Sequence, residues 1–90
     1  MPQAIVDPDE LDAFAMELNR FNSVLRDSAH RVRGRFNELG TTWRDQEQRR
    51  FAAEFEQMIV VIDRFLQVSD QQVPLLRRKA TKAREYLTQR

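Results

Sequence analysis

A single tryptophan lies in a short break between two long stretches of helical hydrophobic spacing. Gly40 precedes Trp43 by three residues, and the chain has only two glycines. On either side of this break, apolar residues recur at steps of three and four, which is the spacing of one helix face. No stretch alternates apolar and polar residues as a strand would. The sequence therefore predicts an all-α fold, an antiparallel helical hairpin whose turn contains Trp43.

The first helix has signals at both ends. Asp7 suits the N-cap, Pro8 suits the first helical position, and Glu10 completes a capping box. Gly40 is expected to end the helix as a left-handed C-cap. We therefore expect a helix over residues 8–39. Its expected apolar face consists of Leu11, Phe14, Leu18, Phe21, Leu25, Ser28, Val32, Phe36 and Leu39.

Thr42 is the expected N-cap of the second helix, which places a turn at residues 40–42 and a helix over residues 43–74. Pro74 lies where this helix has retraced the first, and proline removes a backbone donor. We therefore expect residues 75–90 to form a kinked or frayed helical tail without an antiparallel neighbour. Residues 1–90 form one domain on this reading. The expected apolar face of the second helix consists of Phe51, Phe55, Met58, Ile62, Phe65, Ser69, Val73, Leu76, Ala80, Ala83 and Leu87.

Five consecutive apolar residues in the second helix predict an interface with another chain. These residues are Met58, Ile59, Val60, Val61 and Ile62. Consecutive residues on a helix point in different directions, so a two-helix contact can cover only some of them. An exposed apolar patch of this kind usually marks an interface. We expect two hairpins to associate into a four-helix bundle, as a homodimer or as a heterodimer with a related hairpin.

Composition excludes several classes of function. The chain has no cysteine and one histidine, so we expect no disulfide, no metal site and no cofactor. His30 has no nucleophile to activate, and we expect no catalytic residues and no enzymatic activity. No apolar run reaches the length of a membrane-spanning helix, and the first residues do not resemble a cleaved signal peptide.

The C-terminal segment is basic. Residues 71–90 carry six bases and one acid, whereas the rest of the chain is mildly acidic. A solvated helix face would also explain these charges, and no set of aromatic residues accompanies them, so we do not expect nucleic-acid binding. The segment can instead dock on a partner protein. Its expected recognition residues are Arg77, Arg78, Lys79, Lys82, Arg84 and Tyr86.

The turn residues Gly40, Trp43, Asp45 and Phe51 make the chain resemble the WXG family, small bacterial helical hairpins linked to type VII (ESX-type) secretion. The resemblance covers nearly the whole chain, with Leu39 four residues before the tryptophan and Phe51 eight residues after it. Asp45 replaces the glycine of the Trp-x-Gly motif and can act as a capping acid instead. The family's C-terminal export signal is Tyr followed four residues later by Asp or Glu, but here Tyr86 is followed by Arg90, which puts autonomous export in doubt.

The resemblance implies a non-enzymatic interaction protein in a type VII-like pathway. Such a protein is a secreted component or a partner of one, is found in the cytoplasm, and leaves the cell without a cleaved signal peptide. A membrane-associated secretion ATPase would recognise residues 75–90. The alternative is a cytoplasmic helical adaptor or chaperone that uses the basic tail to bind an acidic partner.

Overall fold

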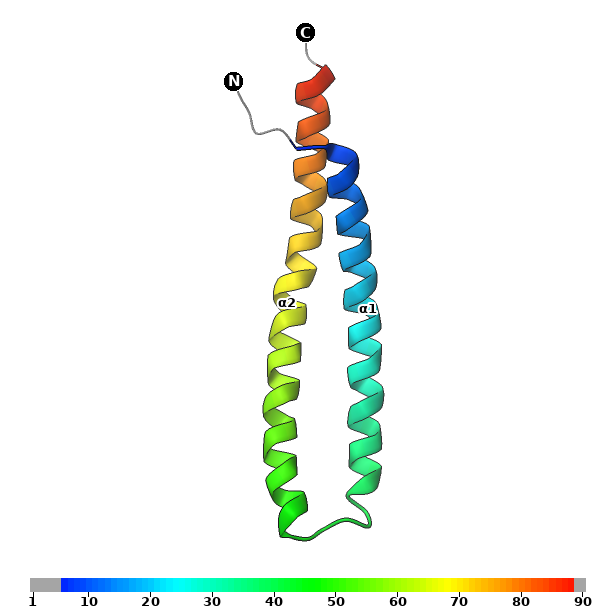
Figure 1. Ribbon diagram of the computed structural model, residues 1–90, viewed down its shortest axis with the longest axis vertical. Coiled ribbons are helices and arrows are strands. Elements are labelled where there is room, and N and C mark those ends of the chain that lie inside the picture. Colours follow the sequence, from blue (N-terminus) through cyan, green and yellow to red (C-terminus); the bar gives the residue numbers. More distant parts are fainter. Residues whose placement is uncertain (1–5, 89–90) are drawn as a thin grey trace.

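The computed structural model describes residues 6–88 and shows a helical hairpin (Figure 1). Helix α1 spans Pro8–Leu39 and helix α2 spans Gln46–Thr88, and the described residues contain no strand. The two helices run antiparallel along a particle of 69 × 20 × 14 Å. The predicted all-α hairpin is therefore confirmed.

Helix α1 begins where the sequence predicted. The carboxylate of Asp7 accepts a hydrogen bond from the backbone N–H of Asp9 at 2.9 Å, and Pro8 occupies the first turn. The end of the helix differs from the prediction in its geometry. Gly40 has φ −64° and ψ −14°, which is right-handed, so the expected left-handed C-cap is wrong. After Leu39 the backbone instead forms a tight turn, in which the N–H of Trp43 donates to the carbonyl oxygen of Leu39 at 2.9 Å.

Helix α2 begins three residues later than predicted, and Asp45 rather than Thr42 caps it. The Asp45 carboxylate accepts a hydrogen bond from the N–H of Gln48 at 2.9 Å, and its carbonyl accepts one from the N–H of Arg49 at 3.2 Å. This is the N-cap arrangement, in which a side chain satisfies a free N–H of the first turn. The connection between the helices therefore spans residues 40–45, not 40–42.

The prediction that the chain frays after Pro74 and lacks an antiparallel neighbour there is wrong for the described residues 75–88. Helix α2 runs through Pro74 to Thr88 without interruption. Ala80 is fully buried, and Arg84 forms ion pairs with α1. Because α2 begins slightly beyond the turn end of α1, it needs more residues to return along its neighbour (Figure 1). The hairpin contact therefore extends to Arg84, well past the expected end at residue 74.

The core is a narrow seam between the helices. Buried residues of α2 follow steps of three, four and seven, as in an antiparallel coiled coil. They are Phe55, Ile59, Leu66, Ser69, Val73 and Ala80. The expected α2 face was partly wrong, since Phe51, Met58 and Phe65 are 43–51% exposed and lie beside this seam. In α1 the buried positions are Pro8, Ala15 and Asn22, again at seven-residue spacing.

A polar layer interrupts this seam near the middle of the hairpin. Asn22 is only 1% exposed. Its amide nitrogen donates to the Asp70 carboxylate at 3.1 Å, and its amide oxygen accepts from the Ser69 hydroxyl at 2.8 Å. Arg26 pairs with the same Asp70 carboxylate. Each buried polar group thus has a partner, which is the condition for burying it without a large penalty.

Candidate interaction surface

The two flat faces of the hairpin differ in chemistry. On one of them, charged residues beside the seam pair across the helices. Arg26 pairs with Asp70, and Arg84 pairs with Asp12 at 2.7 Å and with Asp9 at 2.8 Å. These charged groups of the polar face are therefore already paired within the chain.

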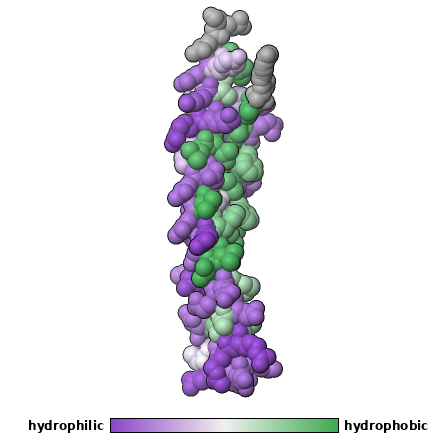
Figure 2. Space-filling model, turned by 90° about the vertical axis from the view of Figure 1, so that its left-hand side faces the viewer, coloured by the Kyte–Doolittle hydropathy of each residue, from purple (hydrophilic) through white to green (hydrophobic). Residues whose placement is uncertain are grey.

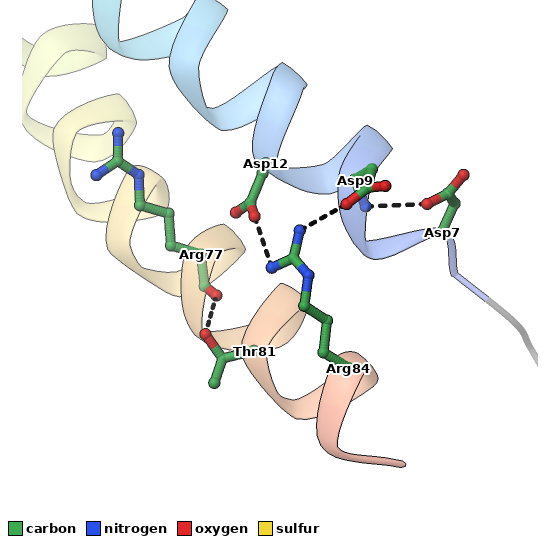
Figure 3. A network of polar contacts seen from close by, with 6 residues as sticks. All are labelled: Asp7, Asp9, Asp12, Arg77, Thr81 and Arg84. Atoms are coloured by element: carbon green, nitrogen blue, oxygen red, sulfur yellow. Dashed lines mark hydrogen bonds and ion pairs between the residues drawn. The ribbon is translucent and has the colours of Figure 1, made fainter. Parts of the chain in front are cut away.

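The close-up in Figure 3 shows how α2 is attached to the start of α1. The Arg84 guanidinium lies between the carboxylates of Asp9 and Asp12, while the Arg77 guanidinium points away from them. Hydrogen bonds to Asp9 and then Asp12 raise the pKa of Arg84 above its ordinary value, so the side chain stays charged. Arg84, expected as a recognition residue, is thus engaged within the hairpin.

Replacing Arg84 by Gln is expected to loosen the end of α2. The neutral amide cannot pair with two carboxylates, so helix opening near residues 81–88 should become easier. Hydrogen exchange measured by mass spectrometry should show faster exchange there and unchanged exchange around Leu66. Arg78→Gln is the matched control on an exposed residue. Equal exchange in both variants would show that the ion pairs do not hold the helix end.

The opposite flat face is apolar and open. Two of its residues meet across the helices, since the rings of Phe21 and Phe65 are 6.0 Å apart with an edge-to-face angle of 88°. We call this surface the apolar face. It comprises Phe14, Phe21 and Val24 of α1 and Phe51, Met58, Val61, Phe65, Val68 and Leu75 of α2, each 43–66% exposed.

Figure 2 shows the side of the hairpin formed by α2. Apolar residues form a band along much of its length, bordered on one edge by hydrophilic residues, and the turn end is hydrophilic. A contiguous apolar band on a small protein usually marks a site of association. The band is longer than the predicted five-residue patch because it recurs every seven residues along α2.

The structure divides the predicted interface residues into two groups. Met58, Val60 and Val61 are 51–66% exposed, so they are available to a partner. Ile59 is 5% exposed and faces α1, and Ile62 is only partly exposed. Sequence reasoning did not assign a further set of exposed apolar residues to the interface, although Phe14 and Phe21 are seven residues apart, as are Val68 and Leu75. They are Phe14, Phe21, Val24, Val68 and Leu75.

The turn residues form an aromatic cluster at one end of the hairpin. Trp43 is partly buried, and its ring lies 6.1 Å from that of Phe51. The ring of Phe36 in α1 lies 5.6 Å from that of Phe51 and 4.8 Å from that of Phe55. Trp43 thus packs on the end of the core.

Of the predicted recognition residues, all but Arg84 are available on the surface of α2. Arg77, Arg78, Lys79 and Lys82 are exposed, and Tyr86 is 72% exposed. Arg90 lies outside the described residues, so the structure does not place the charge that follows Tyr86 by four positions.

Two kinds of site are absent from the part of the chain that the structure describes. Residues 6–88 contain no group of three or more His, Asp or Glu side chains placed to hold a metal ion. Neither described helix is long and apolar enough to cross a membrane.

The described residues thus form a two-helix hairpin with an aromatic turn and one open apolar face. Residues 3–86 match the family described as WXG100, proteins of 100 residues with WXG. The chain belongs to this family, as its turn residues predicted. No curated protein and no solved structure matches it.

Family membership carries a coarse functional statement. WXG100 proteins are small helical proteins associated with type VII secretion, and they typically form dimers. In this chain Asp45 occupies the position of the motif glycine. The turn still forms, because the Asp45 side chain caps α2.

Proposed function

We propose that this chain is a non-enzymatic interaction subunit of a type VII-like secretion pathway. It pairs through its apolar face with another hairpin to form a four-helix bundle. In that bundle, the exposed C-terminal part of α2, with Arg78, Lys79, Lys82 and Tyr86, is presented to a secretion ATPase. The pair assembles in the cytoplasm and leaves the cell without a cleaved signal peptide.

The apolar face is the observation that supports this proposal. Hairpins of two helices bury little apolar surface, so they usually need further association for stability. Here the polar face is closed by ion pairs, whereas the apolar face exposes five large side chains on α2 between Met58 and Leu75. Pairing with another chain would remove this apolar surface from water, which is energetically favourable.

Replacing Val61 by Lys is expected to prevent pairing. Val61 is 66% exposed in the hairpin, so the change leaves the fold of one chain intact, but it places an unpaired charge in the buried interface. Sedimentation equilibrium of the wild type should report about twice the chain mass of 10.7 kDa, and the variant should report a single chain.

Val60→Lys is the matched control. Val60 is 57% exposed, and as the neighbour of Val61 on a helix it points about 100° away from it, outside the residues of the apolar face. It should leave pairing unchanged. If both variants pair as the wild type does, the apolar face is not the interface and the proposal fails.

A further inference from the structure

The part of α2 after Pro74 is attached to α1 in a different way from the rest of the helix. Before Pro74, α2 buries large side chains such as Ile59 and Leu66 against α1. In residues 75–88, which we call the C-terminal arm, Ala80 is the only buried residue. The stabilisation from apolar burial grows with the area removed from water. The C-terminal arm is therefore held by little apolar burial.

A cluster of ion pairs attaches the C-terminal arm to α1. The Arg84 guanidinium pairs with Asp9 at 2.8 Å and with Asp12 at 2.7 Å (Figure 3). We call these three residues the clasp. Their side chains are open to solvent even when paired, since Arg84 is 44%, Asp9 86% and Asp12 38% exposed. Ion pairs this exposed are individually weak, and other charged groups can reach and displace them.

Pro74 lies at the boundary between the C-terminal arm and the anchored part of α2. Just before this boundary, Asn22 of α1 forms hydrogen bonds with Ser69 and with Asp70. Proline has no N–H, so the carbonyl oxygen of Asp70, four residues earlier, lacks its usual helical donor. Sharp bends in helices occur at such positions. Helix α2 is therefore fixed on one side of Pro74 and easily bent at it.

The clasp joins an acidic segment to a basic one. Residues 7–12 at the start of α1 carry four acids and no base, and residues 77–84 of the C-terminal arm carry five bases and no acid. Within residues 6–88, Arg84 is the only one of these five bases in an ion pair. The start of α1 thus already occupies one position that an acidic binding partner of the arm would use.

We propose that the clasp holds the C-terminal arm closed against α1, and that an acidic segment of the binding partner releases it. Carboxylates of the partner displace Asp9 and Asp12 from Arg84, and the arm bends away from α1 at Pro74. A ligand that binds the open form better shifts the chain toward that form. The proposal rests on the proposed function, because the arm contains the residues presented to the partner. Release adds Arg84 to that surface.

The double variant Asp9→Asn with Asp12→Asn tests the competition. The probe is a fluorescein-labelled deca-glutamate peptide, and fluorescence anisotropy measures its binding to the full chain. Because an arm that is open in only a fraction of the chains weakens the apparent affinity by that fraction, the variant should bind the peptide at least about threefold more tightly than the control described next.

The matched control is the double variant Glu10→Gln with Glu17→Gln. It removes the same charge from the same end of α1, so it corrects for the general attraction between the chain and an acidic peptide. Glu10 and Glu17 are exposed, and within residues 6–88 neither of them forms an ion pair. Equal affinities in the two double variants would overturn the competition between α1 and the partner.

Three pairs of spin labels locate the motion. The chain has no cysteine, so paired cysteines can be labelled uniquely, and all six chosen positions are exposed. Successive pairs are seven residues apart on both helices. They are Asp27 with Gln71, Arg20 with Arg78, and Ala13 with Glu85.

Double electron–electron resonance measures the label distances, with unlabelled chain added in excess so that only distances within one chain are observed. Removing both clasp carboxylates should leave the pair at Gln71 unchanged, because it lies before Pro74. The distance to position 78 should increase, and the distance to position 85 should increase most, because it is farthest from the bend. Addition of deca-glutamate to the wild type should produce the same order of changes.

Contrary results separate this inference from the proposed function. An increase for the pair at Glu85 alone would show that the helix end frays, and it would overturn bending at Pro74. Unchanged distances in all three pairs would overturn the clasp. Both results leave the association of hairpins intact, since Val61→Lys tests that separately. Pairing that survives Val61→Lys would remove the proposed function, whereas the opening of the arm within one chain would still be decided by the label distances.

Discussion

Replacing Leu66 by Ala is expected to lower the free energy of unfolding by about 2–3 kcal/mol. Leu66 is 6% exposed in a seam that is only one side chain deep on each helix, so the removed atoms leave a void or a local collapse. Urea unfolding followed by circular dichroism measures the effect. Wild type and variant are compared at one protein concentration, because pairing would add to apparent stability.

Val60→Ala is the control for this prediction. Val60 lies on the same helix but is 57% exposed and outside the apolar face, so truncating it should change the free energy of unfolding by less than about 0.5 kcal/mol. Comparable losses in the two variants would mean that the seam does not hold the hairpin together.

The first helix could be predicted closely because its limits depend on local chemistry. Asp7 and Pro8 specify the start through one hydrogen bond and one fixed backbone angle, and the helix spans Pro8–Leu39 as expected. The family could also be predicted, since Trp43 and its aromatic neighbour at position 51 are read directly from the chain. These features need no knowledge of the partner helix.

The start of α2 and its continuation past Pro74 depend on contacts between distant residues, and sequence patterns do not show which of these contacts form. Thr42 and Asp45 are both good N-caps, and the choice is settled by the chain path from Leu39 to Trp43. Pro74 costs a helix about 3 kcal/mol in isolation. In the hairpin, burial of Val73 and Ala80 against α1 offsets this cost, and Pro74 itself is exposed.

The candidate site was predicted only in part because α2 carries two apolar stripes. One includes Ile59 and Leu66 and packs on α1, and the other includes Met58 and Phe65 and faces outward. Spacing in one helix cannot decide which stripe meets the neighbour. We expect the polar layer to decide it, because Asn22 accepts a hydrogen bond from Ser69 in the seam, and with Ser69 in the seam Phe65 faces outward.

That role leads to the second prediction, on Asn22. Asn22→Ala is expected to cost about 2 kcal/mol of unfolding free energy, since it leaves the buried Ser69 hydroxyl without its acceptor and removes a donor from Asp70. The double variant Asn22→Leu with Ser69→Ala should regain stability near the wild type, because an apolar pair replaces a polar one. Urea unfolding at fixed protein concentration compares the three chains.

The polar layer is expected to control the register of the two helices more than the free energy of unfolding. A buried polar contact fixes the register of packed helices, since sliding one helix would leave the polar groups unpaired. The chain has no cysteine, so cysteines introduced at the exposed positions Asp27 and Arg64 can be spin-labelled uniquely. Label distances should form one narrow distribution with Asn22 present and a broad one in the apolar double variant. A narrow distribution in both would show that packing of the aliphatic residues alone sets the register, and that Asn22 contributes only hydrogen-bond energy.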